Sequence, residues 1–205
     1  MHALILVDIQ NDFVPGGALA VPAGNEIIPL VNGLQNSFDL VIATQDWHPK
    51  HHKSFASTHN NKRPFEKIIL HGLDQVLWPD HCVQGTDGAQ LHSNLNTNKV
   101  EAIFRKGMDP EIDSYSGFYD NGYKKNTGLA GYLRERKVQK VFVCGLAGDY
   151  CVFYTAKDAL KENFETYIIE DATRPIDEDG FLKAKDEILT SGGQIISSKN
   201  LHRYL

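Results

Sequence analysis

Runs of apolar residues alternate along this chain with segments in which apolar and polar positions repeat at helical spacing. Six short runs, rich in β-branched residues, are typical of buried strands: residues 3–9, 40–44, 100–105, 140–144, 165–170 and 194–197. The helical spacing predicts helices over residues 26–36, 128–136, 152–161 and 181–190. Strands that alternate with helices form a mostly parallel sheet covered on both faces. We therefore expect one three-layer αβα domain over residues 1–205, with a parallel six-stranded sheet.

Four reactive side chains come at or just after the carboxyl ends of predicted strands. They are Asp8, Asp46, Lys106 and Cys151. Taken one at a time, each has an ordinary explanation: a carboxylate that caps a turn, an exposed lysine, or a small packed cysteine. In a parallel sheet, however, the carboxyl ends of the strands meet at one edge, and ligands bind in the crevice there. The coincidence favours a single site that contains all four residues.

The segment 141–157 leads from an apolar strand, through a turn of small residues, into a helical pattern that follows Cys151. A helix N-terminus favours the thiolate form of a cysteine. A tight turn can also direct backbone N–H groups at a developing oxyanion. The alternative is a cysteine packed inertly under the helix, which is common for free thiols.

These residues suggest the chemistry of a cysteine hydrolase. Asp8 can accept the thiol proton, and Lys106 can keep that carboxylate ionised or stabilise developing negative charge. The thiolate then attacks a carbonyl carbon, an amine leaves as a thioester forms, and water hydrolyses the thioester. No histidine is placed to form a papain-like pair with Cys151.

A second group of residues has the character of a metal site. Asp46 and His48 lie two positions apart, so in an extended segment both side chains point to the same side. Carboxylate and imidazole groups are common ligands of divalent metals, and a later loop carries His81 and Cys82. If the two loops meet, His81 completes a set of two histidines and one carboxylate, while Cys82 is interpreted as a packed thiol. Three further histidines in the first loop are interpreted as solvated: His51, His52 and His59.

The composition excludes several classes of function. The formal net charge is −5 and there is no basic block, so nucleic-acid binding has no electrostatic basis. No apolar run approaches the ~18 residues that a membrane span requires, and the N-terminus lacks the basic segment of a signal peptide. The three cysteines form no disulfide framework, which favours a reducing, cytoplasmic setting. The loop 113–119 is aromatic and suits one wall of a ligand pocket.

Five motifs in this chain resemble those of the nicotinamidases among the isochorismatase-like cysteine hydrolases. In chain order they are LILVDIQNDFVPGGALAVPAG, ATQDWHP, WPDHCVQGT, KGMDPEIDSYSGF and VCGLAGDYCV. The pair ATQDWHP and WPDHC is specific, because most metal-free relatives lack it. The resemblance implies the strand order 3-2-1-4-5-6 for the six sheet strands.

The resemblance also implies roles for individual residues. It implies catalytic Asp8, Lys106 and Cys151, a divalent metal on Asp46, His48 and His81, and an aromatic pocket of Phe13, Trp78 and Tyr115. It implies a cis peptide bond between Leu146 and Ala147, with the N–H groups of Ala147 and Cys151 directed at the amide oxygen. Ser54 falls where some members have a further metal ligand or a water-holding residue. The expected metal is zinc in preference to iron or manganese.

The implied reaction converts nicotinamide and water to nicotinate and ammonia in NAD salvage, and pyrazinamide is expected to react as well. The metal would bind the pyridine nitrogen directly or through water. The expected partner is this small molecule, with no nucleic acid and no membrane, and a homo-oligomer is compatible with the resemblance. One departure stands out, because Gly148 occupies a position where the common pattern has threonine.

Three alternatives remain at this point. The first is an amidase or vinyl-ether hydrolase of the isochorismatase group, which would not need the metal. The second uses Asp46, His48 and His81 as a facial triad for iron-dependent oxygen chemistry, which leaves the other reactive residues idle. The third is a non-enzymatic binding protein, which would not need the Asp8, Lys106 and Cys151 set.

Overall fold

Six strands lie side by side as one parallel sheet in the computed structural model, which describes residues 1–205. They are β1 (His2–Val7), β2 (Leu40–Asp46), β5 (Val100–Lys106), β6 (Lys140–Leu146), β7 (Glu165–Arg174) and β8 (Gln194–Ile196). Their order is β5-β2-β1-β6-β7-β8. Because β3 and β4 form a separate hairpin, the order counted within the sheet alone is 3-2-1-4-5-6, as expected.

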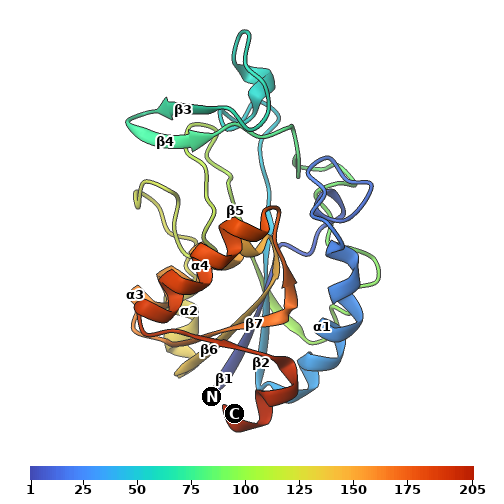
Figure 1. Ribbon diagram of the computed structural model, residues 1–205, viewed down its shortest axis with the longest axis vertical. Helices are drawn as coiled ribbons and strands as arrows, with labels where there is room; N and C mark the ends of the chain where they lie inside the picture. The colour runs from blue at the N-terminus through green and yellow to red at the C-terminus, as the bar shows by residue number, and fades with distance from the viewer.

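Helices cover both faces of this sheet (Figure 1). On one face lies α1 (Ile28–Leu34), and on the other lie α2 (Leu129–Glu135), α3 (Phe153–Lys161) and α4 (Glu178–Thr190). Short 3₁₀ turns occupy Asn11–Phe13, Gly24–Ile27, Gln35–Ser37, Ala56–Thr58 and Ser198–Arg203. The predicted three-layer αβα class is confirmed. No helix combines the length and the apolar character that a membrane span requires.

Alternate residues of the central strands supply two separate cores. In β1, Leu4 and Leu6 pack with Val31 on the α1 side of the sheet. Ile5 and Val7, whose side chains point to the opposite face, pack with the α2, α3 and α4 layer. This division explains why the strands read as continuous apolar runs, since both faces are buried.

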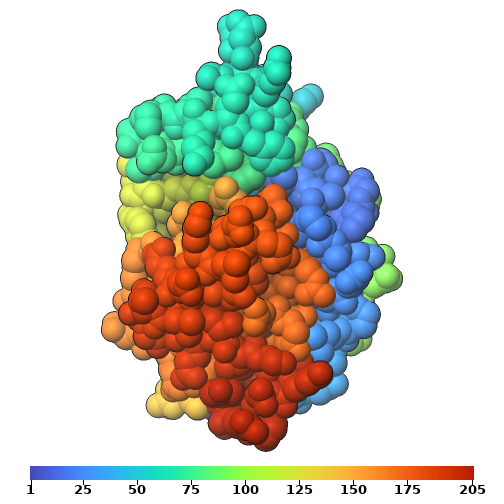
Figure 2. Space-filling view, viewed as in Figure 1, coloured from blue at the N-terminus to red at the C-terminus, as the bar shows by residue number.

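Residues 63–77, whose apolar positions fit neither the helical nor the strand period, contain an antiparallel hairpin. Its strands are β3 (Lys67–Leu70) and β4 (Leu73–Val76), joined at His71 and Gly72, which both have positive φ. The hairpin lies beyond the carboxyl ends of the sheet strands and forms a projecting lobe there (Figures 1 and 2). Its apolar residues are partly exposed, with Ile69 at 68%, so no strict alternation marks it in the sequence.

Element ends differ from the expectation in ways that matter for the site. Strand β1 ends at Val7, and Asp8 adopts a left-handed conformation with a φ of 48°. The helix expected directly after Cys151 begins at Phe153, because Gly148–Val152 form a π-helical turn. In that turn the Val152 N–H donates to the Ala147 carbonyl, five residues earlier. Cys151 therefore lies within a wide turn and not at the first position of α3.

Close contact between β6 and β1 requires a glycine at position 145. Gly145 has a φ of +125°, and a Cβ atom there would lie 2.1 Å from the Val7 carbonyl oxygen. A side chain would therefore separate the two strands that lead to Asp8 and Cys151.

We predict that Gly145→Ala lowers the free energy of unfolding by about 3 kcal/mol or more, because it adds backbone strain and a steric clash. The matched control is Gly131→Ala in α2, where a Cβ meets nothing within 4 Å. That replacement should raise stability by about 0.5–1 kcal/mol, since alanine is the better helix former. Urea unfolding of both variants measures the difference, and equal stabilities would contradict the prediction.

Candidate active site

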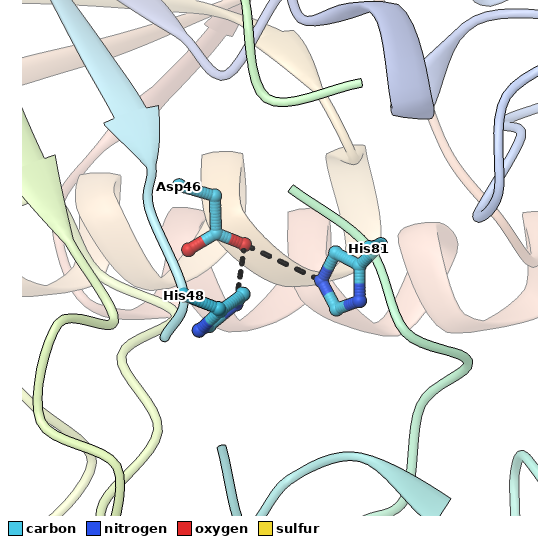
Figure 3. Close-up of side chains that lie close together, drawn as sticks. All are labelled: Asp46, His48 and His81. Carbon is cyan, nitrogen blue, oxygen red and sulfur yellow. Dashed lines mark ion pairs between the residues drawn. The ribbon is translucent and has the colours of Figure 1, made fainter. Parts of the chain in front are cut away.

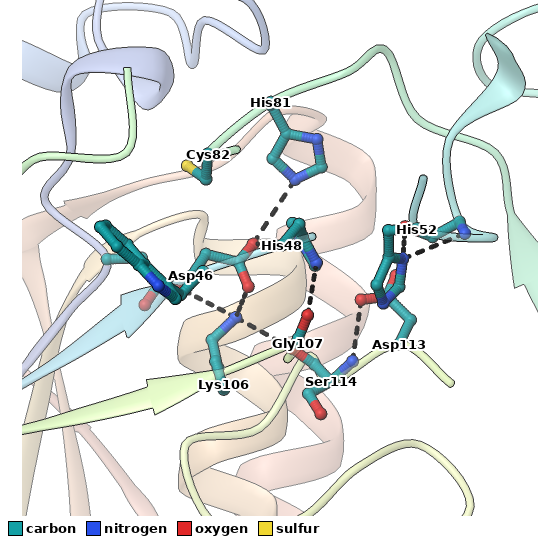
Figure 4. A network of polar contacts seen from close by, with 12 residues as sticks. Asp46, His48, His52, His81, Cys82, Lys106, Gly107, Asp113 and Ser114 are labelled. Atoms are coloured by element: carbon teal, nitrogen blue, oxygen red, sulfur yellow. Dashed lines mark hydrogen bonds and ion pairs between the residues drawn. The ribbon is translucent and has the colours of Figure 1, made fainter. Parts of the chain in front are cut away.

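The four reactive residues predicted at strand ends meet in one buried cluster. Figure 4 shows two of them, Asp46 and Lys106, beside the histidines. Asp8 follows β1, Asp46 ends β2, Lys106 ends β5, and Cys151 lies in the turn after β6. All four side chains are buried. The parallel sheet therefore brings together residues that are up to 143 positions apart in the chain.

The Lys106 ammonium is the centre of this cluster. Its Nζ donates to Asp46 Oδ1 at 3.0 Å, to the Ser114 carbonyl at 2.9 Å and to Cys151 Sγ at 3.4 Å. Asp8 Oδ2 lies 2.9 Å from the same nitrogen, so four neighbours share the three N–H donors of this lysine. Burial disfavours the charged form, but Asp46 and Asp8 raise the pKa of Lys106 well above its usual range. The side chain therefore stays charged.

The two carboxylate oxygens of Asp8 have different neighbours. Its Oδ1 accepts a hydrogen bond from Thr44 Oγ1 at 2.6 Å. Its Oδ2 forms a buried ion pair with Lys106 Nζ at 2.9 Å. Because a carboxylate oxygen has two lone pairs, Oδ2 can also accept a proton from the Cys151 thiol.

The pKa shifts of Cys151 and Asp8 have opposite effects on proton transfer between them, since the first makes the thiol a weaker acid and the second makes the carboxylate a stronger base. Burial raises the pKa of the Cys151 thiol well above its usual range, although Lys106 acts in the opposite direction. Burial also raises the pKa of Asp8, again against the effect of Lys106. The resting thiol is thus protonated, and the nearby carboxylate is a stronger base than an exposed one.

Asp46, His48 and His81 converge as a potential metal site (Figure 3). Asp46 Oδ2 lies 3.0 Å from His48 Nε2 and 3.4 Å from His81 Nε2. The other ring nitrogens face backbone carbonyls, with His48 Nδ1 2.9 Å from Gly107 O and His81 Nδ1 2.8 Å from Pro79 O. Because a carbonyl only accepts, each Nδ1 carries a proton and each Nε2 is left to bind a metal.

The buried charges fit a divalent cation at this position. Three buried carboxylates, Asp8, Asp46 and Asp113, surround the cluster, whereas Lys106 is the one buried ammonium. The formal sum is therefore −2, and uncompensated buried charge is costly. A divalent ion bound by Asp46, His48 and His81 would bring the sum to zero. Burial favours neutral His48, but Asp46 raises the pKa of that ring, so a metal competes there with a proton.

His52 contradicts the interpretation as a solvated loop histidine, because its side chain is fully buried beside His48. Its Nδ1 accepts the Ser54 backbone N–H at 3.1 Å and contacts Ser54 Oγ at 2.7 Å. The neutral ring therefore carries its proton on Nε2 and cannot bind a metal through that atom. Burial lowers the pKa of His52 to about 4, so the ring is neutral. Of the other two, His51 is exposed and His59 partly exposed.

One pocket connects the reactive thiol with the metal position. The predicted aromatic residues Phe13, Trp78 and Tyr115 line it, as do Asp46, His81, Ala147 and Cys151. Four further residues line it: Leu19, Asp113, Tyr150 and Ile176. Leu19 and Tyr150 fall inside the first and last of the five motifs, and Asp113 belongs to the loop 113–119, expected to form a pocket wall. Ile176 lies outside every motif.

The turn before Cys151 has the expected backbone form, since the peptide bond between Leu146 and Ala147 is cis. The Gly148 position is tightly enclosed. A Cβ atom there would lie 3.0 Å from the Phe181 ring and 3.0 Å from Thr173 Cγ2. The space that a threonine side chain would need is therefore already occupied by Phe181 of α4.

All three cysteines are free and buried. Cys82 is a packed thiol, as interpreted, and its backbone N–H donates to Asp12 Oδ2 at 2.7 Å. Burial raises the pKa of Cys144 to about 12. Cys151 alone of the three lines the pocket and contacts a lysine.

The chain is similar to known proteins along nearly all of its length. Residues 2–200 match the isochorismatase domain. The nicotinamidase of Acinetobacter baylyi is 50% identical over 200 residues, which cover 97% of this chain and 94% of that protein. The solved nicotinamidase and pyrazinamidase of Acinetobacter baumanii has a TM-score of 0.95 at 48% identity, covering 98% of this chain and 97% of that one. The pyrazinamidase of Pyrococcus horikoshii, solved with zinc, has a TM-score of 0.79 at 38% identity, covering 96% and 98%.

The three-layer fold and the match over nearly all of its length place the chain in the isochorismatase family. Within that family, two relatives at 50% and 47% identity are nicotinamidases.

We predict that Lys106→Met lowers the free energy of unfolding of the metal-free protein by about 3–5 kcal/mol. The variant leaves the buried carboxylates of Asp8 and Asp46 without a cation. The control is Lys125→Met, which breaks an exposed pair with Asp109 and should change stability little. Chemical denaturation in the presence of a chelator measures both, and similar losses would contradict the central role of Lys106.

Proposed function

We propose that this protein is a metal-dependent nicotinamidase, a single 205-residue hydrolase domain that converts nicotinamide and water to nicotinate and ammonia. The observation that carries the proposal is the pocket that Cys151 shares with Asp46 and His81. A pyridine amide has an electrophilic carbon at one position and a ring nitrogen at another. It can therefore meet a thiol and a metal at the same time.

The reaction begins when Cys151 Sγ attacks the amide carbon and its proton passes to Asp8 Oδ2. The carbonyl oxygen takes the negative charge and is stabilised by the N–H groups of Ala147 and Cys151. Asp8 then returns the proton to the amide nitrogen, the C–N bond breaks, and ammonia leaves as the thioester forms. Asp8 next accepts a proton from water, which attacks the thioester, and Cys151 leaves as the thiol once it is reprotonated.

Lys106 holds this geometry through both halves of the reaction. Its contacts with Asp8 and Cys151 keep base and nucleophile adjacent, and its charge favours each anionic form in turn. A divalent metal on Asp46, His48 and His81 would act as a Lewis acid for the pyridine nitrogen, directly or through water. Phe13, Trp78 and Tyr115 would hold the ring, with aromatic contact contributing about 1 kcal/mol beyond burial.

Zinc is the proposed metal. Two imidazoles and one carboxylate with open positions form the usual ligand set of a catalytic zinc site. The pyrazinamidase of Pyrococcus horikoshii was solved in complex with zinc, and Asp46, His48 and His81 of this chain lie close enough together to hold a metal ion.

Ammonia release from nicotinamide, pyrazinamide and benzamide at equal concentration tests the proposed function. We expect the first two to be hydrolysed. Benzamide lacks the ring nitrogen and should react at least ~100-fold more slowly, because an unpaired polar partner discriminates strongly. If benzamide reacts as fast as nicotinamide, the metal does not recognise the ring. If none of the three releases ammonia, the amidase assignment is wrong.

Replacing His81 by Ala tests the metal site. We expect the purified variant to lose bound metal and its KM for nicotinamide to rise strongly, while the fold survives. The matched control is His51→Ala on the exposed part of the neighbouring loop, which should keep one metal per chain. Metal content measured by atomic absorption separates the two variants. A full complement of metal in the His81 variant would contradict the proposed ligand set.

A further inference from the structure

The buried carboxylate of Asp113 takes no part in the proposed reaction, yet it lines the same pocket as Cys151 and Trp78. Only neutral groups donate hydrogen bonds to this carboxylate. The Ser114 N–H donates to Oδ1 at 2.8 Å (Figure 4), and Gln75 Nε2 donates to Oδ2 at 3.0 Å. The buried ammonium of Lys106 pairs with Asp8 and Asp46, not with Asp113. A buried carboxylate without a cation is costly to retain, so its charge calls for an explanation.

Asp113 lies beside the metal position but outside the predicted ligand set. One of its carboxylate oxygens, one ring nitrogen of His52 and one ring nitrogen of His48 all lie within 4.8 Å of one another. Gln75 Nε2 also contacts the Tyr115 hydroxyl at 3.2 Å. The carboxylate is thus held between the metal ligands and the aromatic wall of the pocket.

The charge of the loaded site depends on this residue. With Asp8, Asp46 and Asp113 negative, Lys106 positive and a divalent metal bound, the formal sum is zero. Without the Asp113 charge the same site would carry one net positive charge. The substrate amide is neutral, whereas the product is a carboxylate that is ionised at neutral pH. A positive site would therefore retain the product more tightly than the substrate.

We propose that Asp113 is a specificity-determining residue that weakens the binding of pyridine carboxylates relative to pyridine amides and so limits product inhibition. This inference rests on the proposed function. It requires no contact between Asp113 and the ligand, because Coulomb repulsion between buried charges acts over several ångströms. Asp113 forms and breaks no bond in the reaction, so its charge changes the dissociation constants of substrate and product and not the chemical steps.

The test measures dissociation constants, with turnover prevented by Cys151→Ala. Isothermal titration of the zinc-saturated protein with nicotinamide and with nicotinate gives the ratio of the two constants. We expect nicotinate to bind the more weakly of the two. Adding Asp113→Asn, which removes the charge and keeps the shape, should tighten nicotinate binding about tenfold relative to nicotinamide. Asp113→Glu keeps the charge and should preserve the original ratio.

The matched control is Asp74→Asn, which removes an exposed carboxylate of a neighbouring pocket and should leave the ratio unchanged. Metal content is measured for every variant, so that a lost ion is not mistaken for a lost charge. An unchanged ratio in the folded, zinc-loaded Asp113→Asn protein would overturn the inference.

A second measurement tests the inference even if Asp113→Asn does not fold. If nicotinate binds the Cys151→Ala protein as tightly as nicotinamide does, the inference is wrong. The proposed function fails separately. If the Cys151→Ala protein binds no nicotinamide and the parent releases no ammonia from it, both are wrong. If nicotinamide is bound and hydrolysed but the ratio does not respond to Asp113, only the inference is wrong.

Discussion

The buried ammonium of Lys106 is the constraint on which this site depends. It donates to three separate segments, namely the end of β2, the loop at Ser114 and the turn at Cys151. A single charge thus joins the proposed metal site to the proposed nucleophile. The same ammonium lies 2.9 Å from Asp8 Oδ2 and stabilises the ionised carboxylate of the proposed base.

Backbone carbonyls have a comparable influence on the metal side. The carbonyls of Gly107 and Pro79 determine which nitrogen of His48 and His81 carries a proton. At His52 a backbone N–H does the opposite and removes that ring from the set of possible ligands. The three buried histidines thus differ in which ring nitrogen carries the proton, because the backbone group next to Nδ1 is an acceptor at His48 and His81 and a donor at His52. A count of histidines in the sequence cannot make that distinction.

Much of the architecture could be predicted because both faces of the sheet are buried. Strands covered on both sides read as continuous apolar runs, and a polar residue at the end of such a run stands out, as Asp8 and Asp46 do. The hairpin β3–β4 gave no such signal, since its residues are half exposed and pack on one side only. The burial of His52 and the charge of Asp113 escaped prediction for another reason. Both follow from loops folding over the sheet edge, and local spacing does not encode that contact.

Asp46 and Lys106 are also register partners on the adjacent strands β2 and β5. Side chains alternate between the faces of a sheet, so a slip of one residue would turn one of the two away from the other. Strand β5 lies at the edge of the sheet, where it has one neighbour to specify its alignment. The ion pair between Lys106, a proposed catalytic residue, and Asp46, a proposed metal ligand, therefore also favours the correct alignment of the two strands. Chains in which β5 is misaligned would be compact but inactive. The specific activity of a refolded sample would therefore measure the fraction of molecules in which β5 is correctly aligned.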